Sequence, residues 1–555
     1  MKKHFKNILG LMALFAVLSI QSCKDKHEDP IGEEEEEETT TSVHVAFAGG
    51  GWRAHTGHSA WTIGLLKDGQ RSLSSAFENV ETISSNSGGS WFSTMLMYSS
   101  QFDTDIQASG AISSWDSTGW LGKQIALFGA IDNCLLDHTL EYTYCVLKHY
   151  GNGLNWKTAV ENLVFEGYNL GTANLSDAKQ SWASEKALLL QTSLMTSNVV
   201  LNGSTLGDKY YYQACFFPSE LDMDGWERSS CDPEVLSIVS PASFWSFPSG
   251  SSLNPPEFLP QIGSGSTGVP YNLGYTNNAI VDPTPYYTYV QNPITVNEVP
   301  VMSAAASSSA AVGFLGSDNW LSDWEAAYEL RNLAVSFSLA NSTVTDIDVE
   351  GVPLETLSDT LAVRLADGGT VDNSAVAQLV AHLQANGQDS GINIIAFDNV
   401  TEKFKTQSNS VEAGMDIAHL FGFGVCNGPS FCAGDNCGIP CYDTVSPQVF
   451  SNASFQNTPI VWEYTDSDPN AEHKLIYTKY TFTTVENDAF GVKAGSTGTL
   501  HAFSCIYSDA GTEPTASPSE GGFTAYQEML QFVYDGITSN GGLQYLESAF
   551  QISGD

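Results

Sequence analysis

Cations are scarce in this chain: 22 lysines and arginines stand against 63 aspartates and glutamates in 555 residues, giving a formal net charge of −41 at pH 7. The acidic content is ordinary for the length, so the charge results from missing lysine and arginine. A chain without a basic stripe has no surface that attracts phosphate backbones, which excludes nucleic acid as a partner. The same charge opposes tight docking on strongly anionic membranes.

The apolar run at the N-terminus is too short to cross a bilayer, which takes about 20 residues. The run Ile8–Ile20 has 13 residues, follows three lysines and precedes Gln21-Ser22-Cys23. This order is typical of an export signal, here residues 1–22. The small residue before Cys23 resembles a bacterial lipoprotein signal, in which Cys23 becomes lipidated; an ordinary cleaved signal is the alternative. We expect an exported protein, either lipid-anchored at the cell surface or outer membrane, or secreted.

Apolar residues are almost absent from residues 23–42, where Glu33–Glu38 and a threonine run stand instead. Like charges without a hydrophobic face cannot form a core, so we predict a solvated acidic tether. Over the whole chain, 42% hydrophobic and 11% aromatic residues are ample for a packed core. No repeat of 20–50 residues is visible, and we interpret residues 43–555 as a single domain.

Tight C-x2-C pairs, which are common in zinc modules, are lacking. Of the ten cysteines, nine remain besides Cys23, and four of these lie in a loop at residues 420–445. We predict disulfide staples for this Cys-rich loop and no metal site, with zinc as the alternative. The odd number leaves at least one thiol unpaired within the monomer. The nine are Cys134, Cys145, Cys215, Cys231, Cys426, Cys432, Cys437, Cys441 and Cys505.

Short apolar strands and helical patterns alternate along the chain. Strands are predicted at 43–48, 80–83, 360–365, 392–397 and 474–485, and helices at 55–67, 91–98, 371–384 and 524–550. This alternation predicts an α/β layered fold with a largely parallel sheet. Residues 101–359 are too many for a loop and are expected to add helices and a cap around the core.

Three consecutive glycines, Gly49–Gly51, follow the first predicted strand. The G-x-G-x-x-G spacing of a dinucleotide site is missing. Glycines after a strand let backbone N–H groups approach a ligand closely, and a helix N-terminus behind them would add positive potential. The segment therefore suits an oxyanion hole, with an ordinary glycine-rich turn as the alternative.

Ser87 lies in a strand-to-helix turn with the sequence Ser85-Asn86-Ser87-Gly88-Gly89. Small residues on both sides permit the strained geometry of a nucleophile elbow, although Ser85 replaces the usual first glycine. Ser87 is therefore a candidate nucleophile. A serine that caps the following helix is the alternative.

Asp367 ends a predicted strand and precedes Gly368-Gly369. In a fold of this class, a carboxylate at a strand end points into the crevice where ligands bind. Asp367 is therefore a candidate catalytic carboxylate, and an ordinary Asp-Gly turn is the alternative.

In their order and neighbours, these motifs resemble the lysophospholipase and cytosolic phospholipase A2 catalytic-domain family, especially its fungal phospholipase B branch. G-G-G-W-R-A at 49–54 is similar to the family's G-G-G-[FY]-R-A, and S-G-G-S-W at 87–91 is similar to its L-S-G-G-S-W. D-G-G-T-V-D-N at 367–373, followed by I-I-A-F-D, is similar to its D-G-G…N and a later strand that ends in Asp. Residues 241–265 and 304–314 also resemble family segments, so the resemblance covers roughly 43–400.

The resemblance implies a patatin-like three-layer α/β/α fold and hydrolysis of fatty-acyl esters of phospholipids or lysophospholipids at a membrane surface or micelle. It implies a dyad in which Asp367 takes the proton of Ser87, whose oxygen attacks the ester and forms an acyl-enzyme. The N–H groups of Gly50 and Gly51 would hold the oxyanion, and Arg53 would contact phosphate.

The resemblance requires no histidine, cofactor or metal ion, and we interpret His55 and His58 as packing residues. The chain departs from the family pattern at Ser85, at Asn86 and at Ala304–Ala306, where the family has glycine and threonine. These departures leave two alternatives to a phospholipase. One is a general esterase or lipase, and the other is a catalytically inactive lipid-binding surface lipoprotein.

Overall fold

The computed structural model describes residues 42–113, 156–165, 167–196, 212–214, 237–256, 267–268, 299–310, 335–338, 362–400, 403–405, 412–423, 447–456, 458–465, 473–487, 489–507 and 522–552. All of them fall within one unit of the chain, Thr41–Asp555. The predicted export signal, Cys23, the acidic tether and the cysteines of the 420–445 loop lie outside the described residues. Cys505 is described, and its thiol is buried and unpaired, in agreement with the odd number of cysteines.

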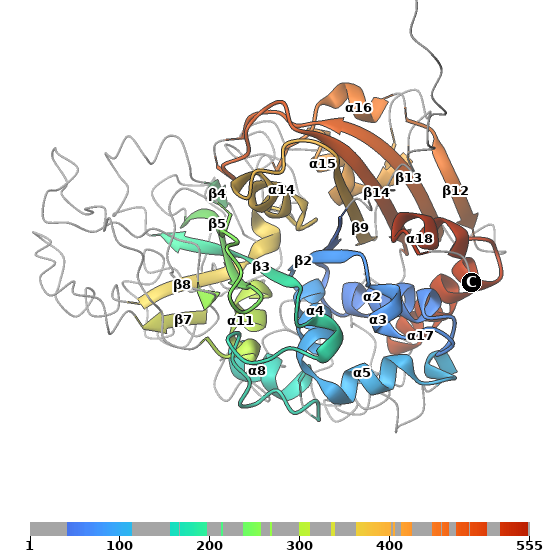
Figure 1. Ribbon diagram of the computed structural model, residues 1–555, viewed down its shortest axis with the longest axis horizontal. Helices are drawn as coiled ribbons and strands as arrows, with labels where there is room; N and C mark the ends of the chain where they lie inside the picture. The colour runs from blue at the N-terminus through green and yellow to red at the C-terminus, as the bar shows by residue number, and fades with distance from the viewer. Residues whose placement is uncertain are drawn as a thin grey trace, which may run out of the picture. The chain divides into compact units, whose positions relative to one another are not determined.

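Five parallel strands form the centre of the sheet. In spatial order they are β14 (Thr497–Ile506), β9 (Ile392–Val400), β1 (Val43–Phe47), β2 (Val80–Asn86) and β3 (Ala187–Thr196). Neighbours in this order pair in parallel (Figure 1). The strands predicted around residues 43, 80 and 392 are therefore adjacent central strands, as a parallel α/β sheet requires.

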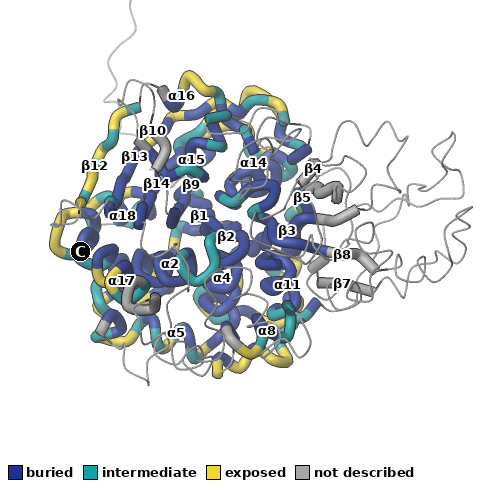
Figure 2. Tube along the Cα trace, turned by 180° about the vertical axis from the view of Figure 1, so that it is seen from behind, coloured by how far each residue is buried: buried dark blue, intermediate teal, exposed yellow. Residues whose placement is uncertain are grey.

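Antiparallel strands extend the sheet on both sides of this centre. Beside β14 lie β13 (Lys474–Thr483) and β12 (Ile460–Thr465); beyond β3 lie β5 (Ser237–Ser246), β4 (Tyr212–Ala214), β6 (Thr267–Gly268), β8 (Ala362–Asp367) and β7 (Val335–Ser338). Within the described residues the sheet has 12 strands. β12 is its partly exposed edge, whereas the central strands are buried (Figure 2).

Side chains alternate between the two faces of the central strands. In β1, Val45 and Phe47 belong to one apolar cluster and Ala46 to the other. Helices on the first face are α2 (Gly51–Leu65), α4 (Gly88–Tyr98) and α17 (Gly522–Thr538), and those on the second are α14 (Val376–Ala385) and α15 (Met415–His419). The sheet thus lies between two helix layers, which confirms the predicted α/β/α fold (Figure 1).

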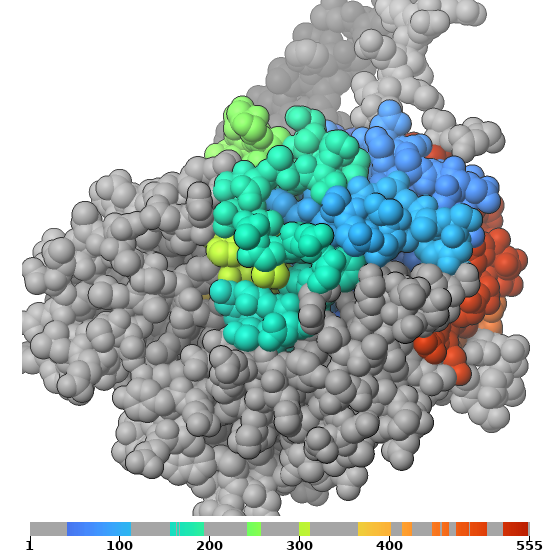
Figure 3. Space-filling view, turned by 90° about the horizontal axis from the view of Figure 1, so that it is seen from below, coloured from blue at the N-terminus to red at the C-terminus, as the bar shows by residue number. Residues whose placement is uncertain are grey.

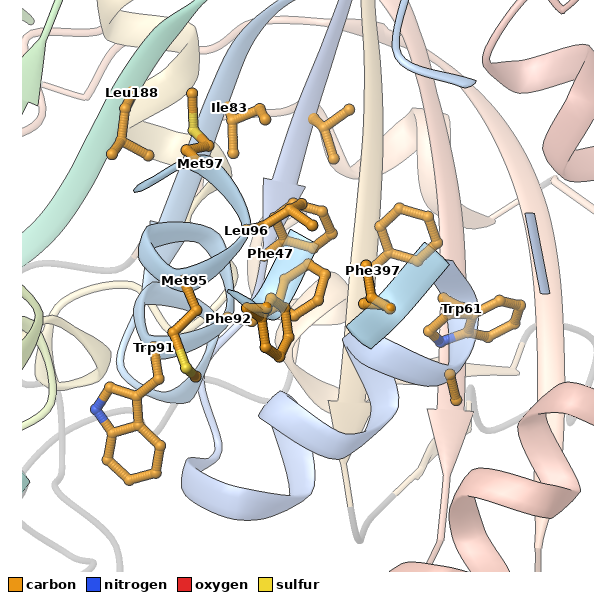
Figure 4. Packing of buried hydrophobic residues seen from close by; sticks show 14 of the residues in the cluster. Phe47, Trp61, Ile83, Trp91, Phe92, Met95, Leu96, Met97, Leu188 and Phe397 are labelled. Atoms are coloured by element: carbon orange, nitrogen blue, oxygen red, sulfur yellow. The ribbon is translucent and has the colours of Figure 1, made fainter. Parts of the chain in front are cut away.

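Aromatic rings fill the first face where β1 and β9 pass under α2 and α4. The ring centroid of Phe47 lies 5.0 Å from that of Phe92 and 5.6 Å from that of Phe397, and Trp61 continues the row (Figure 4). Each buried ring contributes about 1.5–3 kcal/mol. This packing fixes α2 and α4 against the ends of the strands that carry the glycine loop and Ser87.

All four predicted helices have somewhat different boundaries in the structure, and two of the differences have a clear local cause. The helix predicted at 371–384 begins at Val376, because the Asp372 carboxylate accepts backbone hydrogen bonds from Ser374 and Ala377 and holds the preceding residues in a turn. The helix predicted at 524–550 is two helices, α17 and α18 (Leu543–Ala549). Gly541 lies between them with a φ of 85°, a left-handed conformation that ends a helix.

Within the described residues, the range 101–359 contributes strands to the sheet as well as helices, of which α11 (Val301–Ser308) is buried. The other helices that lie in or next to this range are α5 (Ser100–Gln107) and α8 (Trp156–Leu163). Elsewhere in the described residues are the helices α3 (Leu73–Ala76) and α16 (Asn452–Gln456), and β10 (Lys403–Lys405) pairs with β11 (Glu412–Gly414). α8 packs against α11, whose atoms are seen among those of residues 156–196 in Figure 3. Among the helices of the described ranges, none is long and apolar enough to cross a membrane.

Candidate active site

The glycine loop and Ser87 leave the sheet side by side. β1 and β2 run parallel with Phe47 opposite Ser85, so the residues that follow the two strands share one end of the sheet. The two loops touch, because a Cβ on Gly49 would lie 2.9 Å from the Ser87 Cβ. Two of the predicted motifs are therefore brought together by parallel pairing alone.

Asp367 reaches the same place from the opposite direction. β2 pairs along one edge of β3 as far as Asn86 opposite Gln191. β8 continues along that edge as an antiparallel strand, with Asp367 opposite Thr192, while β5 occupies the other edge. β2 and β8 therefore meet end to end beside β3, and their junction joins Ser87 to Asp367. Asp367 does end a strand, as predicted, but that strand is not one of the parallel ones.

Ser87 forms the whole turn between β2 and α4, and its backbone is strained. Its φ of 48° and ψ of −123° are unusual for a residue with a side chain and cost about 1–3 kcal/mol. The Ser87 N–H is held by the Ser308 hydroxyl at 3.0 Å. The next position, Gly88, requires glycine, because a Cβ there would lie 2.0 Å from the Gly51 carbonyl oxygen. This is the geometry of a nucleophile elbow, with the hydroxyl carried at the tip of the turn.

The Ser87 hydroxyl donates a hydrogen bond to Oδ2 of Asp367 at 2.7 Å. The other carboxylate oxygen, Oδ1, accepts the backbone N–H of Gly369 at 2.7 Å. Burial raises the pKa of Asp367 to about 6, while these two hydrogen bonds oppose the rise. A carboxylate with such a pKa is ionised at neutral pH and accepts a proton more readily than an exposed aspartate.

The glycine loop presents backbone N–H groups next to this pair. Gly50 has a φ of 125° and directly precedes α2, and Gly51 has a φ of 56° and begins it. No described residue accepts a hydrogen bond from the N–H of Gly50 or Gly51, and a Cβ on Gly51 would meet nothing within 4 Å. Gly49, by contrast, donates its N–H to the Asn373 carbonyl at 2.8 Å. Donors at the positive end of a helix are suited to an oxyanion.

Arg53 lies on the first turn of α2, beside the glycine loop. Its Nε donates to the Asn399 carbonyl at 2.7 Å, and its Nη2 would lie 2.8 Å from a Cβ on Gly50. The guanidinium therefore covers Gly50 and is half-buried, and among the described hydrogen bonds none joins it to Ser87 or Asp367. A role in contacting phosphate stays a prediction.

The two histidines of α2 are fully buried packing residues, as interpreted from the sequence. His58 donates from Nε2 to the Ala48 carbonyl at 2.8 Å, and its Nδ1 accepts from the Asn399 amide at 3.0 Å. Burial lowers the pKa of His58 and of His55 to about 3, so both rings are neutral. Among the described residues no histidine contacts the Ser87 hydroxyl, which leaves Asp367 as its partner.

Sequence reasoning missed three residues that brace the site. Ser308, at the end of α11, binds the Ser87 N–H and the Ser90 hydroxyl and donates to the Gln191 carbonyl. Asn373 links the glycine loop to Asn86. Ser308 belongs to the segment 304–314 that resembles a family motif, and Asn373 closes the 367–373 motif, so both carried a signal. The third, Asp416, carried none.

The two departures from the family pattern beside Ser87 both have contacts. Ser85 shares a hydrogen bond with Ser93 at 2.6 Å, underneath the elbow. Asn86 donates from Nδ2 to the Asp372 carbonyl at 3.0 Å and so ties the nucleophile strand to the loop of Asp367. Neither residue prevents the elbow from forming.

No group of three or more His, Cys, Asp or Glu side chains that could hold a metal ion occurs within the described ranges. No protein-family profile matches the chain, and no curated protein matches it in sequence. Among solved structures, human GIVD cytosolic phospholipase A2 aligns with 93% of this chain at 11% sequence identity and a TM-score of 0.38. The alignment spans 63% of that neighbour's length. The function proposed below therefore depends on the contacts around Ser87 and Asp367.

Proposed function

We propose that the protein hydrolyses fatty-acyl esters of phospholipids or lysophospholipids through a Ser87–Asp367 dyad. The observation that carries the proposal is the 2.7 Å hydrogen bond from a serine at positive φ to a buried carboxylate whose pKa is raised to about 6. An ordinary helix-capping serine has neither the strained backbone nor the buried base.

The reaction follows from these positions. The Ser87 proton passes to Oδ2 of Asp367 as Oγ bonds to the ester carbonyl carbon. The oxyanion is held by the N–H groups of Gly50 and Gly51, each typically worth about 3 kcal/mol in the transition state. When the carbonyl re-forms, the alcohol leaves with the proton from Asp367. Water then attacks the acyl-enzyme by the same route and releases the fatty acid.

The lipid substrate rests on the family resemblance of the three motifs and on Arg53 beside the glycine loop. A guanidinium matches the geometry of a phosphate group, and the position of Arg53 next to the proposed oxyanion donors supports a role in binding the head group. The substrate would be met at a membrane surface or micelle. Rates on phosphatidylcholine, lysophosphatidylcholine, monoacylglycerol and a short p-nitrophenyl ester separate a phospholipase from a general esterase or lipase.

The test of the dyad is fatty-acid release by the wild type, Ser87→Ala and Asp367→Asn. Both variants are expected to lose activity by at least about 1,000-fold, since each removes one member of a unit. Labelling with a fluorophosphonate provides a second measurement that needs no lipid. Equal fatty-acid release by Ser87→Ala and the wild type would refute the proposal; a folded wild type that neither hydrolyses esters nor is labelled would favour the inactive lipid-binding protein.

We also propose that the chain is exported and anchored through a lipidated Cys23. Expression with radiolabelled palmitate should label the wild type and not Cys23→Ser. The variant should then appear in the soluble fraction, because the acyl chains on Cys23 are the proposed membrane attachment. Equal labelling of both proteins would remove the anchor from the proposal without affecting the dyad.

A further inference from the structure

Asn373 is bonded to each loop that builds the site. Its backbone carbonyl accepts the N–H of Gly49 at 2.8 Å, and its Oδ1 accepts Nδ2 of Asn86 at 3.3 Å. Its Nδ2 donates to Oδ2 of Asp416 at 2.6 Å. Asn373 itself closes the loop that begins at Asp367. Asn373 therefore joins the glycine loop through its backbone, and it joins the strand before the nucleophile and Asp416 through its side-chain amide.

The amide of Asn373 has one workable orientation. A Cβ on Gly49 would lie 2.1 Å from its Oδ1, and a Cβ on Gly369 would lie 2.7 Å from it, so this oxygen is wedged between two backbones. Asn86 approaches with a donor, because its own amide is oriented by the hydrogen bond to the Asp372 carbonyl at 3.0 Å. Exchanging oxygen and NH2 would set two donors against each other.

Asp416 selects this orientation, because its Oδ2 accepts a hydrogen bond from Nδ2 at 2.6 Å and would repel Oδ1 in the same place. It lies in the first turn of α15 and is buried. Asp398, at the end of β9, is fully buried beside it, in space left by Gly414. Burial and the neighbouring Asp416 raise the pKa of Asp398 well above its usual range, although Arg53 opposes this. Asp398 and Asp416 thus lie together in a buried place, where Asp416 accepts the hydrogen bond from Asn373.

We propose that Asp416 is a positioning residue for the reaction: it orients Asn373 and thereby holds the Gly49–Gly51 loop and Asn86 in register with Ser87. This inference rests on the proposed function. Among the hydrogen bonds of the described residues, none joins Asp416 to Ser87 or Asp367, so its effect on the chemistry passes through the amide of Asn373. A displacement of the oxyanion donors by about 1 Å is enough to lower a rate about 100-fold.

The experiment compares the full-length wild type with Asp416→Asn, Asn373→Ala and the double variant. Asp416→Asn keeps the shape of the side chain but replaces a carboxylate oxygen by an NH2 group. The new amide can face either the oxygen or the NH2 of Asn373, so it no longer fixes the orientation of Asn373. Hydrolysis of a soluble p-nitrophenyl ester gives kcat and KM, and circular dichroism gives the thermal midpoint. The matched control is Asp105→Asn on α5, where a carboxylate accepts the Gln101 side-chain amide at 2.7 Å in the same way.

We expect Asp416→Asn to lower kcat about 10- to 100-fold with KM within about threefold, and Asp105→Asn to leave both unchanged. The double variant should be no slower than Asn373→Ala within about threefold, since two changes on one path do not add. A kcat of Asp416→Asn within twofold of the wild type, or effects that multiply in the double variant, overturns the inference. A wild type without esterase activity refutes the proposed function instead.

Hydrogen exchange tests the positioning without catalysis. Asp416→Asn should speed exchange in peptides covering residues 48–54 and leave that of α5 unchanged. Unchanged exchange at 48–54 overturns the inference even where no activity is measurable. If Asp416→Asn fails to fold, Asn373→Ala removes the same hydrogen bond from its other end and is judged by the same exchange and kcat criteria.

Discussion

The elbow at Ser87 and the loop at Gly50–Gly51 lie in contact, yet they are bonded in opposite ways. At the elbow, the Ser87 N–H is bound by Ser308 and its hydroxyl by Asp367. In the loop, the N–H groups of Gly50 and Gly51 donate to no described residue. Both regions contain positive φ angles, but only the elbow has a side chain there.

This difference matches what each region does in the proposed reaction. A nucleophile must be held in one geometry, and its strain of about 1–3 kcal/mol persists only where neighbours over-determine the backbone. Oxyanion donors must be positioned but keep their hydrogen-bonding capacity for charge that develops later. The loop is accordingly fixed from behind, through Gly49, Asn373 and His58, rather than at its donors.

Among the changes that test this comparison, the largest effect is expected from Gly49→Ala, which disturbs the contact between the two regions. Its Cβ would lie 2.1 Å from Asn373 Oδ1 and 2.9 Å from Ser87 Cβ, so the loop must move. We expect kcat/KM for a p-nitrophenyl ester to fall by at least about 100-fold. Wild-type kinetics in a folded Gly49→Ala variant would mean that the loop does not position the oxyanion.

The second prediction is an acid limb in the pH profile of kcat/KM. Burial raises the pKa of Asp367 to about 6, so the base is lost below that pH and the rate should fall about tenfold per pH unit. Burial also raises the pKa of Asp372 to about 6, but its carboxylate holds the turn before α14. The Asp372→Asn variant should therefore keep the acid limb. If the acid limb disappeared in this variant, the limb would belong to Asp372 and not to Asp367.

Ionisation of Asp367 affects stability in the opposite direction to activity: it is required for the reaction, but it lowers the free energy of unfolding. Its folded pKa of about 6 exceeds the ordinary value of 3.8, so its contribution to stability is fully present below about pH 3.8 and is lost as the pH rises through about 6. Relative to the wild type, Asp367→Asn should become more stable as the pH rises from 5 to 7. Urea unfolding of both proteins at the two pH values checks this, and a constant difference would contradict it.

A smaller effect is expected from Ser308→Ala, which loosens the elbow alone. It removes the hydroxyl that binds the Ser87 N–H and the Ser90 hydroxyl, worth about 1–2 kcal/mol or roughly a tenfold loss of kcat. Ser307→Ala is the matched control, because the Ser307 hydroxyl bonds the Ser303 carbonyl of its own helix. If both variants had equal kinetics, the brace from α11 would be dispensable.

The smallest effect is expected from Gly51→Ala, which tests the open side of the loop. A Cβ there would meet nothing within 4 Å, and only the φ of 56° opposes it. We expect a loss of about 1–2 kcal/mol in the free energy of unfolding and a change in kcat of less than about tenfold. A fall in kcat/KM as large as that expected for Gly49→Ala would contradict the prediction and show that the loop does not tolerate a side chain on its open side.

The local pattern of the chain determined three of the five central strands and the three site segments, whereas β3 and β14 were not predicted. Apolar runs near Val45, Ile83 and Ile394 predicted buried strands, and glycine and serine at their ends predicted the turns that carry Ser87 and the glycine loop. These features depend on a few neighbouring residues, because β propensity, turn formation and the space beside a nucleophile are local properties.

Only the tertiary structure decided how those segments meet. β8 runs antiparallel to β3 and joins β2 end to end, Ser308 arrives from α11 to hold Ser87, and Asp416 orients Asn373 across 43 residues of sequence. Each is a pairing between distant segments that bear no local mark of their partner. Strand direction and side-chain orientation depend on packing and burial in the folded chain, which the order of residues does not display.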